Sequence, residues 1–131
     1  MKKKLILIVE DDPEMGKIIL ESLSLNGHTI FLAENAGTAL RLFDQKPFDL
    51  VLTDLRLPDQ DGLQLLDAVK SRSVHTPVIM MTGFGTIQNA VEAMRRGAFD
   101  YLLKPCPTDE LLAKVESAWE RRAVRRGPGR T

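Results

Sequence analysis

A short apolar run that ends in an acidic residue constrains this chain more than any other part of its sequence. Residues 50–52 are all apolar, as in a strand that is buried on both faces of a parallel sheet. Pro58 and the pair Asp61-Gly62 follow it and are typical turn residues. Asp54 therefore stands at the carboxyl end of a predicted buried strand, where ligands collect in open α/β sheets. Taken alone, such a residue is equally well explained as a helix or turn cap.

Apolar runs and amphipathic segments alternate along the rest of the chain. The runs predict four more strands, and the segments with apolar residues at helical spacing predict five helices. The strands are expected at residues 5–9, 28–33, 50–53, 77–81 and 99–103, and the helices at 13–26, 36–45, 63–72, 86–96 and 108–124. Strands that alternate with helices predict right-handed crossovers and one parallel sheet covered on both faces, which is an α/β fold.

The first predicted helix has a clear beginning and end. Asp12 precedes Pro13, and such an acidic N-cap with proline at the first helical position is a common helix start. Gly27 is expected to end the helix. Its apolar residues are expected to face the core, and they are Met15, Ile18, Ile19, Leu20 and Leu23.

Size and composition favour one globular domain. The chain has 131 residues, 44% of them hydrophobic, which is enough to bury about two-thirds of the surface that the unfolded chain exposes. Cys106 is the single cysteine, so no internal disulfide can form and a reducing, cytoplasmic environment is expected. The apolar run at residues 5–9 is too short for a secretory or membrane-spanning segment. We therefore expect no membrane association.

The formal net charge is zero, but the charges are unevenly distributed. Residues 1–120 hold all 18 acidic residues and 13 of the 18 basic ones, a formal charge of −5, and residues 121–131 hold the other five, all arginines. A body this acidic argues against direct contact with nucleic acid. The end of the chain loses its apolar periodicity, so we expect a domain at residues 1–122 and a linker or C-terminal tail at residues 123–131.

Polar residues directly follow four of the five predicted strands. They are Glu10 with Asp11 and Asp12, then Asp54, Thr82 and Lys104. Because the carboxyl ends of parallel strands meet at one edge of a sheet, three or four carboxylates, a hydroxyl and an ammonium are expected to share one shallow cleft. Carboxylates this close repel one another unless a cation lies between them. Oxygen ligands without sulfur or histidine favour a hard cation, which predicts Mg²⁺.

Such a cluster can carry a phosphoryl group. With a divalent ion to screen it, a carboxylate such as Asp54 can attack phosphorus and form an aspartyl phosphate. Lys104 and Thr82 could then donate hydrogen bonds to the phosphoryl oxygens. The two histidines, His28 and His75, stand at strand beginnings. They belong at the opposite edge of the sheet, where they cannot activate water for this site.

Four segments that contain these residues resemble the receiver domain of two-component response regulators. They are residues 8–12, 53–62, 81–83 and 100–105, with the sequences IVEDD, TDLRLPDQDG, MTG and DYLLKP. The resemblance covers about residues 4–122. It implies a flavodoxin-like (βα)5 three-layer sandwich whose parallel five-stranded sheet has the order 2-1-3-4-5. It also implies that Asp54 is the phosphoacceptor and that a sensor histidine kinase charges it.

The resemblance also implies a metal site beside Asp54. Asp11 would bind Mg²⁺ directly, Glu10 would act through water, and the backbone carbonyl of Arg56 would be the third protein ligand. Glu10 stands where Asp is more frequent in the family. The substitution lengthens the side chain and keeps its charge.

The same resemblance implies a two-state switch. Thr82 and Tyr101 match the switch pair of the family, and Lys104 matches its phosphate-contacting lysine, followed by a cis Lys104-Pro105 bond. The phosphate would draw the Thr82 hydroxyl inward, and Tyr101 would fill the space left behind. Taken alone, Tyr101 would instead be an ordinary strand aromatic with its hydroxyl in solvent.

The helix at residues 86–96, the strand at 99–103 and the helix at 108–124 would form the face that changes, and this face could dock a partner or form a homodimer. Residues 82–101 look most like receivers of the nitrogen-regulation class, in which a receiver precedes an AAA+ ATPase and a helix-turn-helix DNA-binding domain. No glycine-rich phosphate loop of the Walker type occurs in the 131 residues. The chain is thus expected to be the receiver part of a longer protein or a stand-alone regulator, with transcription as the expected output.

The sequence departs from the family pattern near the phosphoacceptor and after the Lys-Pro pair, and each departure predicts a property of the chain. Phe84 and Arg56 are bulky where the hydrolytic water of the family approaches, so we expect slow self-dephosphorylation. Beyond this and self-phosphorylation from a phosphodonor, no enzymatic activity is expected. Cys106 stands where an aromatic residue often follows the Lys-Pro pair, and we expect it to pack as a small hydrophobic residue.

Three other functions are compatible with parts of this pattern. A Mg²⁺-dependent phosphatase with an Asp nucleophile would need a second acid where Arg56 stands, and a dinucleotide-binding domain would need a glycine-rich turn after the first strand. A receiver-like interaction module that is never phosphorylated stays open. Such a module would normally have lost Asp54, Asp11 or Lys104, and all three are present.

Overall fold

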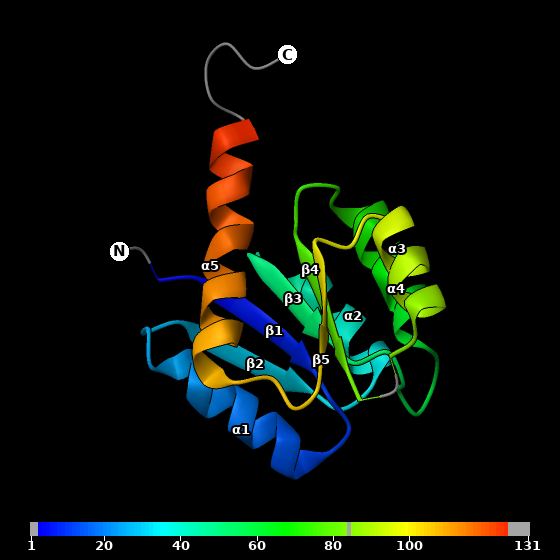
Figure 1. Ribbon diagram of the computed structural model, residues 1–131, viewed down its shortest axis with the longest axis horizontal. Coiled ribbons are helices and arrows are strands. Elements are labelled where there is room, and N and C mark those ends of the chain that lie inside the picture. The colour runs from blue at the N-terminus through cyan, green and yellow to red at the C-terminus, as the bar shows by residue number, and fades with distance from the viewer. Residues whose placement is uncertain (1–2, 84, 126–131) are drawn as a thin grey trace.

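The computed structural model describes residues 3–83 and 85–125. Its elements are β1 (Leu5–Val9), α1 (Pro13–Ser24), β2 (Thr29–Ala33), α2 (Ala36–Gln45), β3 (Leu50–Thr53), α3 (Gly62–Arg72), β4 (Val78–Thr82), α4 (Ile87–Arg95), β5 (Asp100–Leu103) and α5 (Thr108–Arg125). The strands form one parallel sheet of order β2-β1-β3-β4-β5 (Figure 1). The predicted α/β architecture and strand order are confirmed.

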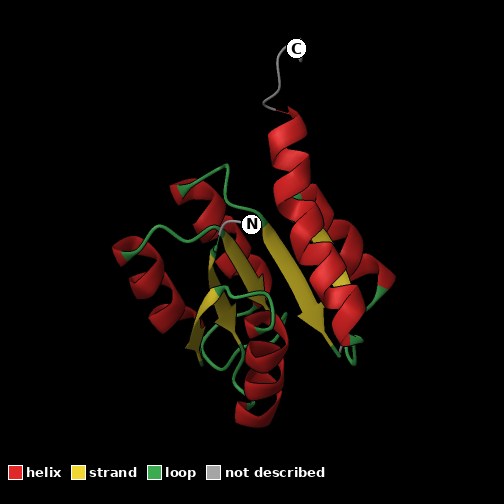
Figure 2. Cartoon of the chain, turned by 90° about the vertical axis from the view of Figure 1, so that its left-hand side faces the viewer, coloured by secondary structure: helices red, strands yellow, loops and turns green. Residues whose placement is uncertain are grey.

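Helices cover both faces of this sheet. α1 and α5 lie on one face, and α2, α3 and α4 lie on the other (Figures 1 and 2). Along β1, Leu7 and Val9 pack with the α2–α4 side, whereas Ile6 and Ile8 pack with the α1–α5 side. This alternation is the two-residue period of a strand. Burial on both faces explains why β1, β3 and β4 are nearly continuous apolar runs, whereas the edge strands β2 and β5 are partly exposed.

The observed bounds differ from the predicted ones by one or two residues. α1 ends at Ser24, two residues before its predicted end, and the chain then turns through Gly27, which has a φ of +80°. α5 continues to Arg125, past residue 122 where the receiver domain is predicted to end. Residues 126–131 of the predicted tail lie outside the described residues. The domain boundary therefore stays a prediction.

One of the residues of α1 that were predicted to face the core is misassigned. Ile19 and Leu23 are buried, but Ile18 is 56% exposed. Ile19 and Leu23 lie in the middle of the helix face that packs on the sheet. Ile18 is rotated about 100° around the helix axis from Ile19 and so lies outside this face. The apolar pattern of α1 is thus wider than the face that the helix buries.

Strand register brings distant residues together at the carboxyl edge of the sheet. Val9 of β1 pairs with Thr53 of β3, and Thr53 pairs with Met80 of β4. Thr82, at the end of β4, pairs with Leu103 of β5. Since all strands run in one direction, the residues that follow these positions are neighbours at one edge.

Candidate functional site

Three carboxylates gather at the carboxyl edge of the sheet. Glu10 and Asp54 follow the paired ends of β1 and β3, and Asp11 follows Glu10. One carboxylate oxygen from each of the three lies within 4.8 Å of the others. Glu10 and Asp54 are buried, whereas Asp11 is exposed, so the cluster is open to solvent on one side. The structure therefore brings together three of the predicted site residues.

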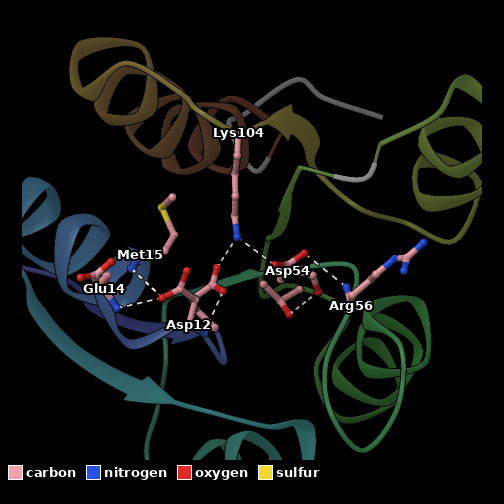
Figure 3. A network of polar contacts seen from close by, with 8 residues as sticks. Asp12, Glu14, Met15, Asp54, Arg56 and Lys104 are labelled. Carbon is pink, nitrogen blue, oxygen red and sulfur yellow. Dashed lines mark hydrogen bonds and ion pairs between the residues drawn. The ribbon is translucent and has the colours of Figure 1, made fainter.

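Lys104 provides a positive charge between two of these carboxylates. Its ammonium group donates a hydrogen bond to Oδ2 of Asp54 at 2.8 Å and another to Oε1 of Glu10. Figure 3 shows the Lys104 side chain extending from its loop toward Asp54. Lys104 directly follows β5, and its bond to Pro105 is cis, as predicted. A residue that is far away in sequence thus completes the cluster.

Burial and hydrogen bonding set the charges at this cluster. Burial raises the pKa of Glu10, and the hydrogen bond from Lys104 offsets only part of this effect. Burial alone would lower the pKa of Lys104, but its hydrogen bonds to Asp54 and Glu10 outweigh that effect and raise it. The ammonium is therefore firmly charged, while ionised Glu10 would be stabilised by a further cation. Such a group of oxygen ligands suits a hard divalent ion.

Asp12, the fourth candidate carboxylate, caps a helix. Its Oδ1 accepts hydrogen bonds from the amides of Glu14 at 3.0 Å and Met15 at 3.5 Å (Figure 3). Its own amide donates to Oε2 of Glu10 at 3.2 Å. The predicted N-cap of α1 is confirmed. The candidate metal-binding group found among the described residues contains three carboxylates, Glu10, Asp11 and Asp54.

The loop after β3 folds back tightly on Asp54. The amide of Arg56 donates to Oδ1 of Asp54 at 3.2 Å (Figure 3), and Arg56 forms an isolated antiparallel bridge with Asp61. Glycine is required at position 62, because a Cβ there would lie 2.3 Å from the carbonyl oxygen of Asp54. These contacts hold the backbone at Arg56. The role of its carbonyl as a metal ligand stays a prediction.

Asp59, at the tip of this loop, has a role that its own sequence neighbourhood does not predict. Its Oδ1 accepts a hydrogen bond from the amide of Ala36 at 3.0 Å, and its Oδ2 accepts one from Gly37 at 2.9 Å. These two hydrogen bonds lower the pKa of Asp59. α2 has no acidic residue in its own first turn, and Asp59 supplies the negative charge that a helix N-terminus favours. The lack of an acidic residue in the first turn of α2 is a local sign that another segment caps this helix, but it does not identify Asp59 as the residue that does so.

The predicted switch residues lie on neighbouring strands. Thr82 is fully buried at the end of β4. The hydroxyl of Tyr101, on β5, is buried and has no hydrogen-bond partner among the described residues, so the alternative of a hydroxyl in solvent is wrong. Burial also raises the pKa of Tyr101. A Cβ at Gly85 would lie 3.1 Å from the Tyr101 hydroxyl oxygen, so the absence of a side chain there leaves room for the ring.

A groove of about 140 Å³ lies beside Lys104, between α1 and the loop that joins β5 to α5. Ile18 lines it from α1, and Cys106 lines it from the loop. Burial raises the pKa of Cys106, and the nearby carboxylate of Glu110 adds to the effect. The thiol therefore stays protonated and packs, half-buried, against the α1–α5 core, as predicted.

The sequence is similar to those of known regulators. Residues 6–116 match the family described as "Response regulator receiver domain". Regulatory protein AtoC of Escherichia coli (strain K12) is 39% identical over 121 residues, which are 92% of this chain and 26% of that protein. The DNA-binding transcriptional regulator NtrC of the same organism is 38% identical over 118 residues, which are 90% of this chain and 25% of that protein. The chain thus spans about a quarter of the length of these relatives.

Solved structures share the fold over nearly the whole chain. A CheY-like response regulator receiver domain protein from Methanospirillum hungatei JF-1 has a TM-score of 0.90 at 30% identity, covering 95% of this chain and 99% of that one. The beryllofluoride-activated NtrC4 receiver domain, solved as a dimer in solution, has a TM-score of 0.87 at 27% identity, covering 91% and 98%. In the part of this chain that the structure describes, no helix has the length and apolarity needed to cross a membrane.

Proposed function

Because this chain belongs to the response regulator receiver domain family of two-component signalling, we propose that Asp54 accepts a phosphoryl group from a sensor histidine kinase in a Mg²⁺-dependent reaction. The chain acts as a phosphoacceptor switch, and phosphorylation changes the face made by α4, β5 and α5. One observation carries this assignment. The ammonium of Lys104 lies 2.8 Å from the carboxylate of Asp54, where it can bind an incoming phosphoryl oxygen.

The donors at this site fit Mg²⁺. Asp11 and Asp54 would bind the ion directly, Glu10 would bind it through water, and Arg56 would contribute its backbone carbonyl. The fit rests on three carboxylates that can place oxygens within 4.8 Å of one another, since hard oxygen ligands suit this ion. When bound, the ion neutralises and orients the phosphoryl oxygens.

The residues of the chain carry out the transfer itself. A carboxylate oxygen of Asp54 attacks the phosphorus of a phosphohistidine, the P–N bond breaks, and its electron pair returns to the imidazole. Lys104 then donates a hydrogen bond to a phosphoryl oxygen, and the Thr82 hydroxyl donates another. A small donor such as acetyl phosphate can react in the same way. The chain thus phosphorylates itself and is not otherwise an enzyme.

Hydrolysis of the aspartyl phosphate is proposed to be slow. Arg56 stands two residues after Asp54 and is exposed, and its bulky side chain would hinder an approaching water. Phe84, the second residue predicted to hinder water, lies outside the described residues. A slow hydrolysis would let the phosphorylated state last long enough to act on an output.

The proposed output face carries an exposed apolar stripe. Ile87, Val91 and Met94 of α4 are 86%, 50% and 47% exposed, and Leu103 of β5 is 59% exposed. Helical spacing of four and three places the α4 residues on one side of the helix. We assign this stripe to a homodimer, with support from the activated NtrC4 receiver domain, which was solved as a dimer. Tyr101 would couple this face to Asp54 through movement with Thr82.

The kinase is proposed to approach over the groove beside Lys104. Exposed Ile18 offers it an apolar contact, and the groove adjoins the phosphoacceptor edge because Lys104 lines it. The reaction would take place in the cytoplasm, where the thiol of Cys106 stays reduced.

The output is proposed to be transcription. The relatives are about four times as long as the matched region, and one is described as a DNA-binding transcriptional regulator. AAA+ and DNA-binding domains outside this chain would carry that output. Residues 1–120 have a formal charge of −5, which disfavours direct contact of the receiver body with nucleic acid.

The test is intact mass spectrometry after incubation with Mg²⁺ and acetyl phosphate. We expect a single phosphoryl adduct that is absent with a chelator and absent in Asp54→Asn. Asp44→Asn is the matched control, because Asp44 is a surface carboxylate on α2 that pairs with Arg72, and it should still be phosphorylated. A folded wild-type chain that gains no adduct from acetyl phosphate or from a phosphohistidine donor would overturn the proposal. An interaction module that is never phosphorylated would then be the better function.

A further inference from the structure

The phosphoacceptor loop is tied to a neighbouring helix by one side chain. Asp59 lies in residues 54–61, which join β3 to α3. Its two carboxylate oxygens accept hydrogen bonds from the amides of Ala36 and Gly37, at 3.0 and 2.9 Å. These are the first two residues of α2, and their amides have no acceptor within the helix. Asp59 therefore completes the start of α2 from a different segment of the chain.

The start of α2 also has a cap of its own. Asn35 accepts a hydrogen bond from the amide of Thr38 at 2.8 Å. Capping of this helix is thus divided between Asn35, which belongs to the same segment, and Asp59, which lies 22 to 24 positions further along the chain. Of these two caps, Asp59 is the one that links the helix to the phosphoacceptor loop, so the two caps can be separated by mutation.

The rest of the loop is held at its two ends. Near its start, Oδ1 of Asp54 accepts a hydrogen bond from the amide of Arg56 at 3.2 Å. At its end, Asp61 begins α3 through a capping box with Gln64, and Gly62 packs closely on the backbone of Asp54. Asp59 adds a third attachment, between these two ends.

We propose that Asp59 is a positioning residue of the metal and phosphoacceptor site, whose contact with α2 holds residues 55–61 so that the carbonyl of Arg56 is kept in place for Mg²⁺. The inference rests on the proposed function, because that carbonyl matters only if the site binds a metal. Asp59 acts through the loop backbone. It is assigned no contact with the metal or the phosphate.

Two physical effects support this role. Hydrogen bonds from amides to a carboxylate are charge-assisted, and the positive end of a helix dipole strengthens them. A loop that is already ordered does not have to lose conformational freedom when the metal binds, so pre-ordering favours binding. Because Asp59 is exposed, water and salt screen its contact. We therefore expect Mg²⁺ affinity to fall about threefold to tenfold without it, near or below the lower end of the range for residues that orient metal ligands.

Mg²⁺ binding to the metal-free chain, measured by isothermal titration calorimetry, tests this inference with three variants. Asp59→Ala removes the contact between loop and helix and should weaken Mg²⁺ binding about threefold to tenfold. Asn35→Ala weakens the same helix start without touching the loop contact. Asp44→Ala removes an equal charge from the other end of α2. Both controls should bind Mg²⁺ within about twofold of wild type, because the side-chain hydrogen bonds found for Asn35 and Asp44 in the described residues go to Thr38 and Arg72 and not to the loop.

Hydrogen exchange without Mg²⁺ supplies a second readout. Asp59→Ala should speed exchange of the Arg56 amide, and Asn35→Ala should leave that exchange unchanged. If Asp59→Ala does not fold, Asp59→Asn replaces it, because it keeps the size of the side chain and only one oxygen acceptor.

Three outcomes separate the inference from its premise. Unchanged Mg²⁺ affinity in a folded Asp59 variant would overturn the inference alone. An equal loss of affinity in Asn35→Ala would also overturn it, because the effect would then come from the stability of α2. A wild-type chain that binds no Mg²⁺ would overturn the proposed function and, with it, the premise of this inference.

Discussion

The two edges of the sheet both hold buried polar groups, but these groups are matched at one edge and unmatched at the other. At the amino edge, Nδ1 of His28 accepts a hydrogen bond from the amide of Lys4 at 3.2 Å, and Nε2 lies 3.2 Å from Oε2 of Glu116. The indole N–H of Trp119 donates to the carbonyl of Asp49 at 3.0 Å. Because an amide can only donate, His28 must accept at Nδ1, and the neutral ring donates from Nε2.

The carboxyl edge has no such balance. Glu10 and Asp54 share the ammonium of Lys104, Asp11 stands beside them, and the Tyr101 hydroxyl has no partner among the described residues. Matched donors and acceptors hold α5 and the beginnings of β1 and β3 in one arrangement. The excess negative charge of the three carboxylates over Lys104 instead favours binding of a cation. The amino edge therefore stabilises the fold, whereas the carboxyl edge is suited to binding a cation.

The largest expected loss of stability comes from removing the Lys104 ammonium that Glu10 and Asp54 share. Lys104→Met leaves Glu10 and Asp54 buried without a counter-charge. When a chelator removes Mg²⁺, we expect this variant to have a free energy of unfolding about 3 kcal/mol lower than wild type. Mg²⁺ should restore much of this loss, because the ion can replace the missing positive charge. Urea unfolding with and without Mg²⁺ measures both values.

A matched variant at the other edge sharpens this result. Glu116→Gln removes a charge from the His28 contact at the amino edge, so its unfolding free energy should not gain more from Mg²⁺ than that of wild type. An equal Mg²⁺ response in Lys104→Met and Glu116→Gln would contradict the division between the two edges.

A smaller loss of unfolding free energy is expected when His28 at the amino edge is replaced. His28→Ala removes two hydrogen bonds and the edge-on ring contact with Trp119, and we expect the free energy of unfolding to fall by about 2 kcal/mol. The rate of phosphorylation by acetyl phosphate should not change, because the residue lies at the opposite edge from Asp54. His75→Ala, at an exposed position, is the control and should change neither quantity. A slower phosphorylation of folded His28→Ala would show that the two edges are coupled.

The smallest expected effect is the dependence on pH of the stability that Asp59 contributes. Hydrogen bonds from Ala36 and Gly37 lower the pKa of Asp59 in the folded chain, so its stabilising contribution is fully present above the unfolded Asp pKa of about 3.9. That contribution is lost as the pH falls through the lower folded value. The difference in Tm between wild type and Asp59→Ala should therefore be clear at neutral pH and should shrink in acid. A difference that grows as the pH falls would contradict this assignment.

The elements could be predicted because each depends on a short stretch of sequence. The run 50–52 is apolar at every position, and a buried strand needs that pattern. Asp12 before Pro13 marks the start of α1, and the structure confirms this cap. The strand order came from the resemblance of four segments, and the structure agrees with it. The roles of Asp54, Asp11 and Arg56 at the site stay predictions, although the structure brings the carboxylates of Asp54 and Asp11 together.

By itself, the sequence determined the periodicity of each element, the residues that cap helices from within their own segment, and the polar residues that follow the strands. Only the tertiary structure decided that Ile18 faces outward, that Asp59 reaches α2, and that Lys104 is shared by Glu10 and Asp54. The physical reason is distance along the chain. Periodicity and capping depend on neighbours within a few residues, whereas these contacts depend on how closely separate segments pack and on which face each helix turns to the sheet.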